Sequence, residues 1–188
     1  MNDSASPEAT PAGAHRAGAT PPEQTSTRAW GFGLATTTES GKVLDTWYPS
    51  PALGSATADQ PPAELKALEG DEPPRKVRRS VVFTEIDLTI PPSSATDAYL
   101  RLHLLSHRLV RPHGQNLEGV FGQLANVVWT SAGPCDPEDF EGTRLRLRAA
   151  VGPVQVYGVD KFPRMTDYVV PTGVRIADAD RVRLGAHL

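Results

Sequence analysis

The chain has 188 residues, a net charge of −3 and a single cysteine, Cys135. This charge gives no general attraction to nucleic acid or to an anionic membrane, and no apolar run approaches the ~20 residues of a membrane span. One cysteine excludes an intrachain disulfide and favours a reducing compartment. Because the first residues lack the basic and apolar segments of a secretory signal, we expect a soluble protein of the cytoplasm.

The first 28 residues are rich in Ala, Pro, Thr, Ser and Gly, and no aromatic or branched aliphatic residue lies among them. Such a segment cannot bury enough apolar surface to offset the entropy lost on ordering. We therefore expect a disordered tail over residues 1–28. A tail that binds a partner is the alternative that this composition leaves open.

Strands and helices are predicted to alternate over residues 29–165, which indicates a compact α/β or α+β domain. Runs of β-branched and aromatic residues predict strands, and Gly41 predicts the turn of a hairpin. The expected strands lie at 31–36, 43–48, within 77–89, 126–130 and 154–157. The expected helices lie at 63–68, 93–110, 116–124 and from 136 to about 149.

Two helix starts carry capping signals. Ser94 and Asp97 have the spacing of a capping box at the start of the longest helix. Asp136 is followed by Pro137, which suits the first position of a helix. We expect Asp136 to cap the last helix.

Aliphatic residues recur every six positions at the end of the chain, at Val170, Ile176, Val182 and Leu188. Four residues after each of the first three comes another position in register: Val174, Asp180 and Ala186. A period of six matches neither a helix nor a simple strand. It is typical of a parallel β-helix, whose coils are stable only against their neighbours. Residues 166–188 are therefore predicted to begin such a helix and to complete about one coil.

Asp180 occupies an in-register position that Val174 and Ala186 fill with apolar groups. One interpretation is an aspartate that points outward into solvent. The other requires a trimer, in which three copies of the carboxylate meet near the threefold axis. Three carboxylates repel one another unless a hard cation such as Mg²⁺ neutralises them. The residues alone leave both interpretations open.

Three other groups suggest chemistry, but each has a simpler explanation. His103 and His107 are close enough on one helix to share a metal, yet the glutamate of the helical zinc-protease motif is missing. The basic run within 75–79 is typical of a solvated surface, so we expect no nucleic-acid partner. Cys135 has no evident activating neighbour. Phosphate-loop, dinucleotide and nucleophile-elbow motifs are absent from the sequence.

Several long runs match one family in sequence order. They are VYGVDKFPRM at 156–165 and DYVVPTGVRIADADRVRLGAHL at 167–188, supported by 99–109, 126–130, 133–135, 33–35 and 43–47. On these runs the chain resembles the actinobacterial form of tetrahydrodipicolinate N-succinyltransferase. The resemblance covers residues 30–188 and is loosest between 50 and 89.

The resemblance implies a cytoplasmic homotrimer of lysine and diaminopimelate biosynthesis. Such enzymes move a succinyl group from succinyl-CoA to the amine of ring-opened tetrahydrodipicolinate. The implied architecture is an N-terminal α/β domain, a left-handed β-helix of hexapeptide repeats and a small C-terminal part. The active site of the family lies between the β-helices of neighbouring subunits.

The family's magnesium ligand in the run I-A-D-A-D falls on Asp180, so the resemblance implies Mg²⁺ there, at the trimer axis. The second magnesium ligand, the glutamate of acyl transfer and the acyl-CoA contacts have no counterpart here. The resemblance therefore assigns no catalytic or cofactor-binding residue to this chain. Lys161 and Arg164 are explained equally well as surface charges or as contacts to a dianionic substrate.

Two hypotheses follow. In the first, these residues are the N-terminal portion of a succinyltransferase and are inactive alone, because the surface that would orient the amine and thioester and stabilise the oxyanion is missing. In the second, they form a non-catalytic module that docks onto a β-helix trimer. The reading frame beyond Leu188 would discriminate them, since further hexads favour the first hypothesis.

Overall fold

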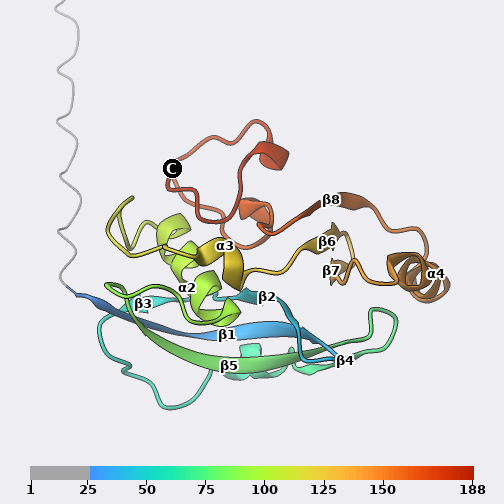
Figure 1. Ribbon diagram of the computed structural model, residues 1–188, viewed down its shortest axis with the longest axis horizontal. Coiled ribbons are helices and arrows are strands. Elements are labelled where there is room, and N and C mark those ends of the chain that lie inside the picture. The colour runs from blue at the N-terminus through green and yellow to red at the C-terminus, as the bar shows by residue number, and fades with distance from the viewer. Residues whose placement is uncertain (1–25) are drawn as a thin grey trace, which may run out of the picture.

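A computed structural model describes residues 26–188, which form two antiparallel sheets with helices packed around them (Figure 1). The larger sheet has the order β2-β1-β5-β4, with β3 paired to β1, and the smaller has the order β7-β6-β8. The larger sheet contains β1 (Arg28–Thr38), β2 (Val43–Trp47), β3 (Ala52–Leu53), β4 (Gly70–Glu72) and β5 (Val77–Asp87). The smaller contains β6 (Val127–Thr130), β7 (Gly133–Cys135) and β8 (Val156–Asp160).

The helices are α1 (Ala63–Lys66), α2 (Ala95–Ser106), α3 (Val120–Gln123) and α4 (Phe140–Val151), followed by the short 3-10 helices η1 (Met165–Asp167) and η2 (Ala179–Arg181). The predicted mixture of helices and strands is therefore confirmed. Most of the tail predicted over residues 1–28 lies outside the described residues, although Arg28 already pairs with Asp87.

The hairpin of β1 and β2 is confirmed, and β1 also pairs with β5 along its whole length. Gly33 is required in β1 by a close approach. A Cβ atom at this position would lie 2.6 Å from Cε1 of Tyr48 and 2.7 Å from Cγ2 of Thr46. The ring of Tyr48 therefore lies directly on the backbone of β1, where only glycine leaves room for it.

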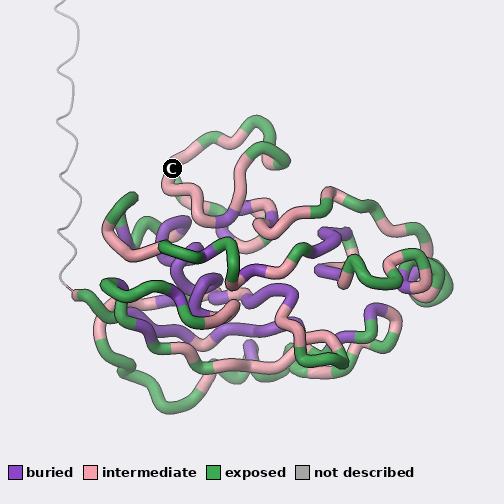
Figure 2. Tube along the Cα trace, viewed as in Figure 1, coloured by how far each residue is buried: buried purple, intermediate pink, exposed green. Residues whose placement is uncertain are grey.

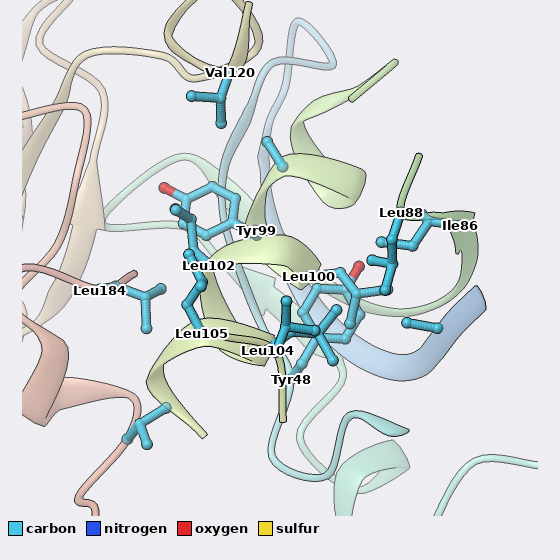
Figure 3. Packing of buried hydrophobic residues seen from close by; sticks show 14 of the residues in the cluster. Tyr48, Ile86, Leu88, Tyr99, Leu100, Leu102, Leu104, Leu105, Val120 and Leu184 are labelled. Carbon is cyan, nitrogen blue, oxygen red and sulfur yellow. The ribbon is translucent and has the colours of Figure 1, made fainter. Parts of the chain in front are cut away.

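Helix α2 forms the centre of the main core. Its predicted cap is confirmed, because Ser94 Oγ accepts a hydrogen bond from the Asp97 amide at 3.2 Å. Ten of its twelve residues are buried, which explains why apolar residues lie on more than one face. Figure 3 shows Leu100 and Leu104 beside Tyr48, and Leu102 and Leu105 on the side facing Leu184. Helix α2 thus joins the larger sheet to the C-terminal segment.

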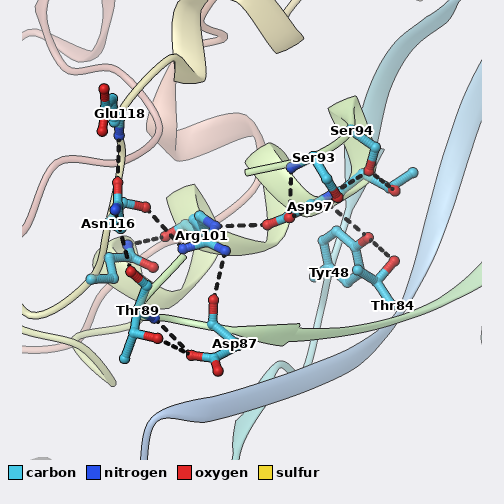
Figure 4. Close-up of polar contacts among 12 residues, drawn as sticks. Tyr48, Thr84, Asp87, Thr89, Ser93, Ser94, Asp97, Arg101, Asn116 and Glu118 are labelled. Carbon is cyan, nitrogen blue, oxygen red and sulfur yellow. Dashed lines mark hydrogen bonds and ion pairs between the residues drawn. The ribbon is translucent and has the colours of Figure 1, made fainter. Parts of the chain in front are cut away.

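A buried arginine fixes the loops around α2. Arg101 is fully buried and pairs with Asp97 through Nε and Oδ1 at 2.7 Å (Figure 4). Its terminal nitrogens donate to the carbonyls of Asn116 and Asp87 at 2.8 and 2.9 Å. Every side of the guanidinium is therefore satisfied, as a buried charge requires.

The start of α4 differs from the prediction. The helix begins at Phe140 with Asp139 as its N-cap residue, so Asp136 does not cap it. The carboxylate of Asp136 instead accepts hydrogen bonds from the Glu138 amide at 3.0 Å and from Lys42 Nζ at 2.7 Å. Asp136 thus stabilises a local turn before the helix in place of capping it, and Lys42 from a distant part of the chain holds its carboxylate.

The C-terminal segment, residues 165–188, lies over α2 without forming a regular coil (Figure 1). Among the described residues, the stretch predicted to start a β-helix has turns, the helix η2 and one isolated bridge between Arg164 and Arg183. The hexad residues also divide: Ile176 and Val182 pack against the core, whereas Val170 is 77% exposed. A coil gains its strand hydrogen bonds from the next coil, and the described chain supplies no second one.

Candidate functional site

Asp180, the predicted metal ligand, lies on the surface in η2. Its side chain is 69% exposed, and Oδ1 forms an ion pair with Arg164 at 2.9 Å. Its amide donates to Asp178 Oδ1 at 3.1 Å, which fixes the turn. No group of three potential metal ligands occurs within the part of the chain that the structure describes. A cation at Asp180 would therefore need ligands from outside the described residues.

His103 in α2 has no ring nitrogen free to share a metal with His107, the C-cap residue of that helix. His103 is fully buried, and both ring nitrogens are occupied: Nδ1 donates to the Tyr99 carbonyl at 2.7 Å, and Nε2 accepts from the Tyr48 amide at 3.2 Å. Burial lowers the pKa of His103 to about 3. Its ring stacks on His107 with the centroids 6.3 Å apart. The pair thus links α2 to the end of β2.

Cys135 and the basic run also have structural roles. Cys135 is buried, and burial raises the pKa of its thiol, which opposes activation as a nucleophile. In the basic run, Arg75 and Arg79 both pair with Glu72, and Arg78 pairs with Asp71. Arg78, whose side chain is 68% exposed, fits the predicted solvated surface, whereas the buried Arg75 does not. Arg75 is drawn into the protein, where its Nη1 donates to the Pro134 carbonyl at 2.8 Å.

Lys161 and Arg164 are the two cations near the predicted β-helix start. The ammonium group of Lys161 is used in hydrogen bonds within the fold. Its Nζ donates to the carbonyls of Phe121 and Leu124 at 2.6 and 2.7 Å, at the end of α3. Arg164 stacks on the ring of Tyr157 at 3.7 Å and pairs with Asp167 at 3.0 Å as well as with Asp180. It therefore ties β8, η1 and η2 together.

A cavity of about 390 Å³ between the two sheets was not predicted from the sequence. It is lined by Leu34, Thr36, Asp45, Trp47, Arg75, Arg79, Trp129, Thr130, Ser131, Gly133, Pro134, Tyr157, Arg164, Asp167 and Tyr168. The register of the larger sheet explains one wall. Thr36 of β1 pairs with Asp45 of β2 on one side and with Arg79 of β5 on the other, so these three side chains share a face.

Asp45 is the most unusual group in this cavity. Burial raises the pKa of its carboxyl group, and the contacts with Thr36 and Tyr168 and the charge of Arg75 only partly oppose this. Tyr168 donates its hydroxyl proton to Asp45 Oδ2 at 2.5 Å, and Trp47 Nε1 donates to the Tyr168 carbonyl at 3.2 Å. Tyr168 lies in a run that carried the resemblance, but no periodicity in the sequence connects it with Asp45.

Comparisons with known proteins agree with the resemblance. The family described as tetrahydrodipicolinate N-succinyltransferase middle matches residues 124–164, which contain the smaller sheet and α4. A 2,3,4,5-tetrahydropyridine-2,6-dicarboxylate N-succinyltransferase of Salinispora tropica, the same enzyme under another name, is 57% identical over 173 residues. That alignment covers 87% of this chain and 54% of the relative. The chain is thus related to the tetrahydrodipicolinate N-succinyltransferases.

A second N-succinyltransferase, from Pseudomonas paraeruginosa, is 52% identical over 111 residues, which are 59% of this chain and 32% of that protein. The crystal structure of a putative 2,3,4,5-tetrahydropyridine-2-carboxylate N-succinyltransferase from Campylobacter jejuni shares the fold, with a TM-score of 0.60 and 19% identity. The superposition covers 86% of this chain and 55% of the Campylobacter chain. The chain spans about half the length of the Salinispora succinyltransferase. No helix within residues 26–188 is long and apolar enough to cross a membrane.

Proposed function

We propose that the chain forms part of an acyltransferase of lysine and diaminopimelate biosynthesis. The whole enzyme would transfer a succinyl group from succinyl-CoA to the amine of ring-opened tetrahydrodipicolinate. The observation that carries this proposal is the 57% identity to an N-succinyltransferase over most of the chain. The described residues have a supporting role, because the resemblance assigns none of them to acyl transfer.

The proposed assembly is a cytoplasmic homotrimer in which a left-handed β-helix continues from the C-terminal segment. The exposure of Val170 and Leu188, at 77% and 44%, supports this continuation. Aliphatic side chains at this spacing gain burial when a further coil covers them. Residues 165–188 would then change from a docked, irregular segment to the first layer of a stack.

Magnesium at the trimer axis fits Asp180 in one respect. Its carboxylate is exposed and of the hard oxygen type that Mg²⁺ prefers. When bound, the ion would neutralise carboxylates that three subunits bring together. Arg164 holds Oδ1 of this carboxylate and would orient it. In a trimeric chain extended through the downstream frame, Asp180→Asn should lower the magnesium retained after gel filtration, whereas Asp178→Asn should not.

The transferase proposal is tested by succinyl-CoA-dependent thiol release with tetrahydrodipicolinate and Mg²⁺. We expect no turnover from the 188 residues and clear turnover from the chain extended through the downstream frame. A reaction needs the amine and thioester held together, and the described residues carry no assigned group for this. Turnover by the short chain would place the chemistry within residues 1–188. No turnover by the extended chain would contradict the proposed function.

The second candidate is a non-catalytic module that docks onto a β-helix trimer. It is favoured by the same exposed residues, Val170 and Leu188, which could cover the end of another stack. Sedimentation velocity of this chain mixed with the extended trimer distinguishes the two. Stable co-sedimentation favours the module, whereas independent sedimentation favours the enzyme part.

A further inference from the structure

The cavity between the sheets has the construction of a small-molecule site. One wall is the row of Asp45, Thr36 and Arg79 across three neighbouring strands. Two strand spacings separate the backbones at the ends of this row, about 10 Å. Trp47 lies beside it, opposite Leu34 in the register of β1 and β2. A volume of about 390 Å³ is in the range of pockets that enclose small ligands.

The opposite wall comes from the smaller sheet and the C-terminal segment. Trp129 and Tyr157 supply aromatic surface from β6 and β8, and Tyr168 follows η1. The indole nitrogen of Trp129 is held by the Asp160 carbonyl at 3.0 Å, and that of Trp47 by the Tyr168 carbonyl at 3.2 Å. The aromatic surfaces are therefore fixed in place before any ligand arrives, which lowers the entropic cost of binding.

The charge of the cavity is unevenly distributed. At one end Arg75 and Arg79 share a single carboxylate, that of Glu72, and the positive charge of Arg75 also acts on Asp45. At the other end Arg164 is paired with two carboxylates, Asp167 and Asp180. Asp45 and Arg79 lie on either side of Thr36, so a ligand with one positive and one negative group would match this pair.

Asp45 and Arg79 also have unused hydrogen-bonding capacity. The Oδ1 atom of Asp45 is buried and forms no hydrogen bond of good geometry with the described residues, although Thr36 lies close enough to act on the pKa of this carboxyl group. Arg79 Nε lies 2.8 Å from Glu72 Oε1 as an ion pair, but this buried nitrogen forms no hydrogen bond within residues 26–188. A buried acceptor without a donor is costly, and a donor from a ligand would remove that cost.

We propose that this cavity binds a small amino carboxylate. The carboxylate pairs with the terminal nitrogens of Arg79, and the ammonium group donates to Asp45. The carbon chain between them packs on Trp47 and Trp129. This site is inferred from the cavity itself and does not depend on transferase activity, so it is testable on the 188-residue chain.

The probes are 4-aminobutanoate and 6-aminohexanoate, with hexanoate and hexylamine as ligands that lack one group. Because two tryptophans line the cavity, binding is followed by tryptophan fluorescence and confirmed by calorimetry. We expect at least one amino carboxylate to bind, and the matched acid or amine to bind about ten- to hundredfold more weakly. Absence of binding by both amino carboxylates, or equal binding by hexanoate, would overturn the proposal.

Three variants locate the site. Arg79→Gln and Asp45→Asn should each weaken binding about tenfold or more. Arg78→Gln is the matched control, because Arg78 is the preceding residue of β5 and lies outside the cavity in an exposed pair with Asp71. Circular dichroism checks the folding of Asp45→Asn, and Arg79→Gln tests the proposal independently of it. Unchanged binding in Arg79→Gln would contradict the assignment.

Discussion

Helix α2 and the C-terminal segment are neighbours, but they are held in opposite ways. Ten of the twelve residues of α2 are buried, whereas only three of the 24 residues of the segment 165–188 are buried, namely Met165, Val169 and Leu184 (Figure 2). The helix is fixed by apolar contacts on all sides and by satisfied buried polar groups. The segment is fixed by three buried apolar residues, by four partly buried ones (Tyr168, Ile176, Val182 and Ala186) and by a set of polar contacts.

This difference predicts two levels of stability. Regions with few buried contacts open at lower free-energy cost than the core to which they attach. Changes within α2 should therefore lower the global free energy of unfolding, whereas changes in the segment should first release the segment. The proposed β-helix continues from this segment. A weak attachment to α2 would allow the segment to form its strand hydrogen bonds with the next coil of that β-helix.

The largest effect is expected from Arg101→Leu in α2. Removing one partner leaves the carboxylate of Asp97 buried without its counter-charge and two carbonyls without donors. Breaking a buried ion pair in this way costs about 3–5 kcal/mol. Urea unfolding followed by circular dichroism measures the change. The control is Arg144→Leu, whose exposed pair with Glu141 should contribute about 0–1 kcal/mol.

Leu184→Ala tests the attachment of the segment. A buried leucine replaced by alanine costs about 2–5 kcal/mol where the surroundings cannot relax. Here we expect faster amide exchange over 165–188, with protection of α2 largely kept. Val170→Ala is the control, because that side chain is 77% exposed. Equal loss of protection in α2 would show that helix and segment unfold as one unit.

Acid should destabilise the core through His103. Its pKa is about 3 in the folded protein and about 6.5 in the unfolded chain, so the unfolded state takes up the proton first. The stabilising contribution of neutral His103 to the free energy of unfolding is therefore fully present above pH 6.5. It falls by about 1.4 kcal/mol for each pH unit as the pH drops from 6.5 toward 3. His103→Gln should flatten this part of the pH profile of unfolding. Parallel profiles for both proteins would assign the acid sensitivity to other groups.

The smallest effect is expected from Ser106→Ala, at the junction of the two regions. The hydroxyl accepts from the Gly185 amide at 2.9 Å and donates to the Ala186 carbonyl at 3.1 Å. Its loss should cost about 1–2 kcal/mol, seen as faster exchange at Gly185 with α2 unaffected. Ser40→Ala, in an exposed turn, should change neither.

The sequence alone determined most of the local elements and revealed the resemblance to a family. Alternation and turn residues predicted the β1–β2 hairpin and β5, and apolar spacing with Ser94 predicted α2. These signals work because they depend on residues close together in the chain. The runs at 156–165 and 167–188 led to the resemblance for the same reason, since a motif is a local property of the chain.

Only the tertiary structure decided where the cavity forms and which partners the individual charged side chains have. Asp45, Arg79 and Tyr168 are far apart in sequence, and only strand register and the docking of the C-terminal segment bring them to one cavity. Likewise, Asp136 forms an ion pair with Lys42 and does not cap α4. Side-chain contacts between distant segments follow from packing, which no local pattern encodes. The proposed role of Asp180 as a metal ligand would require further ligands from outside the described residues, and it stays a prediction.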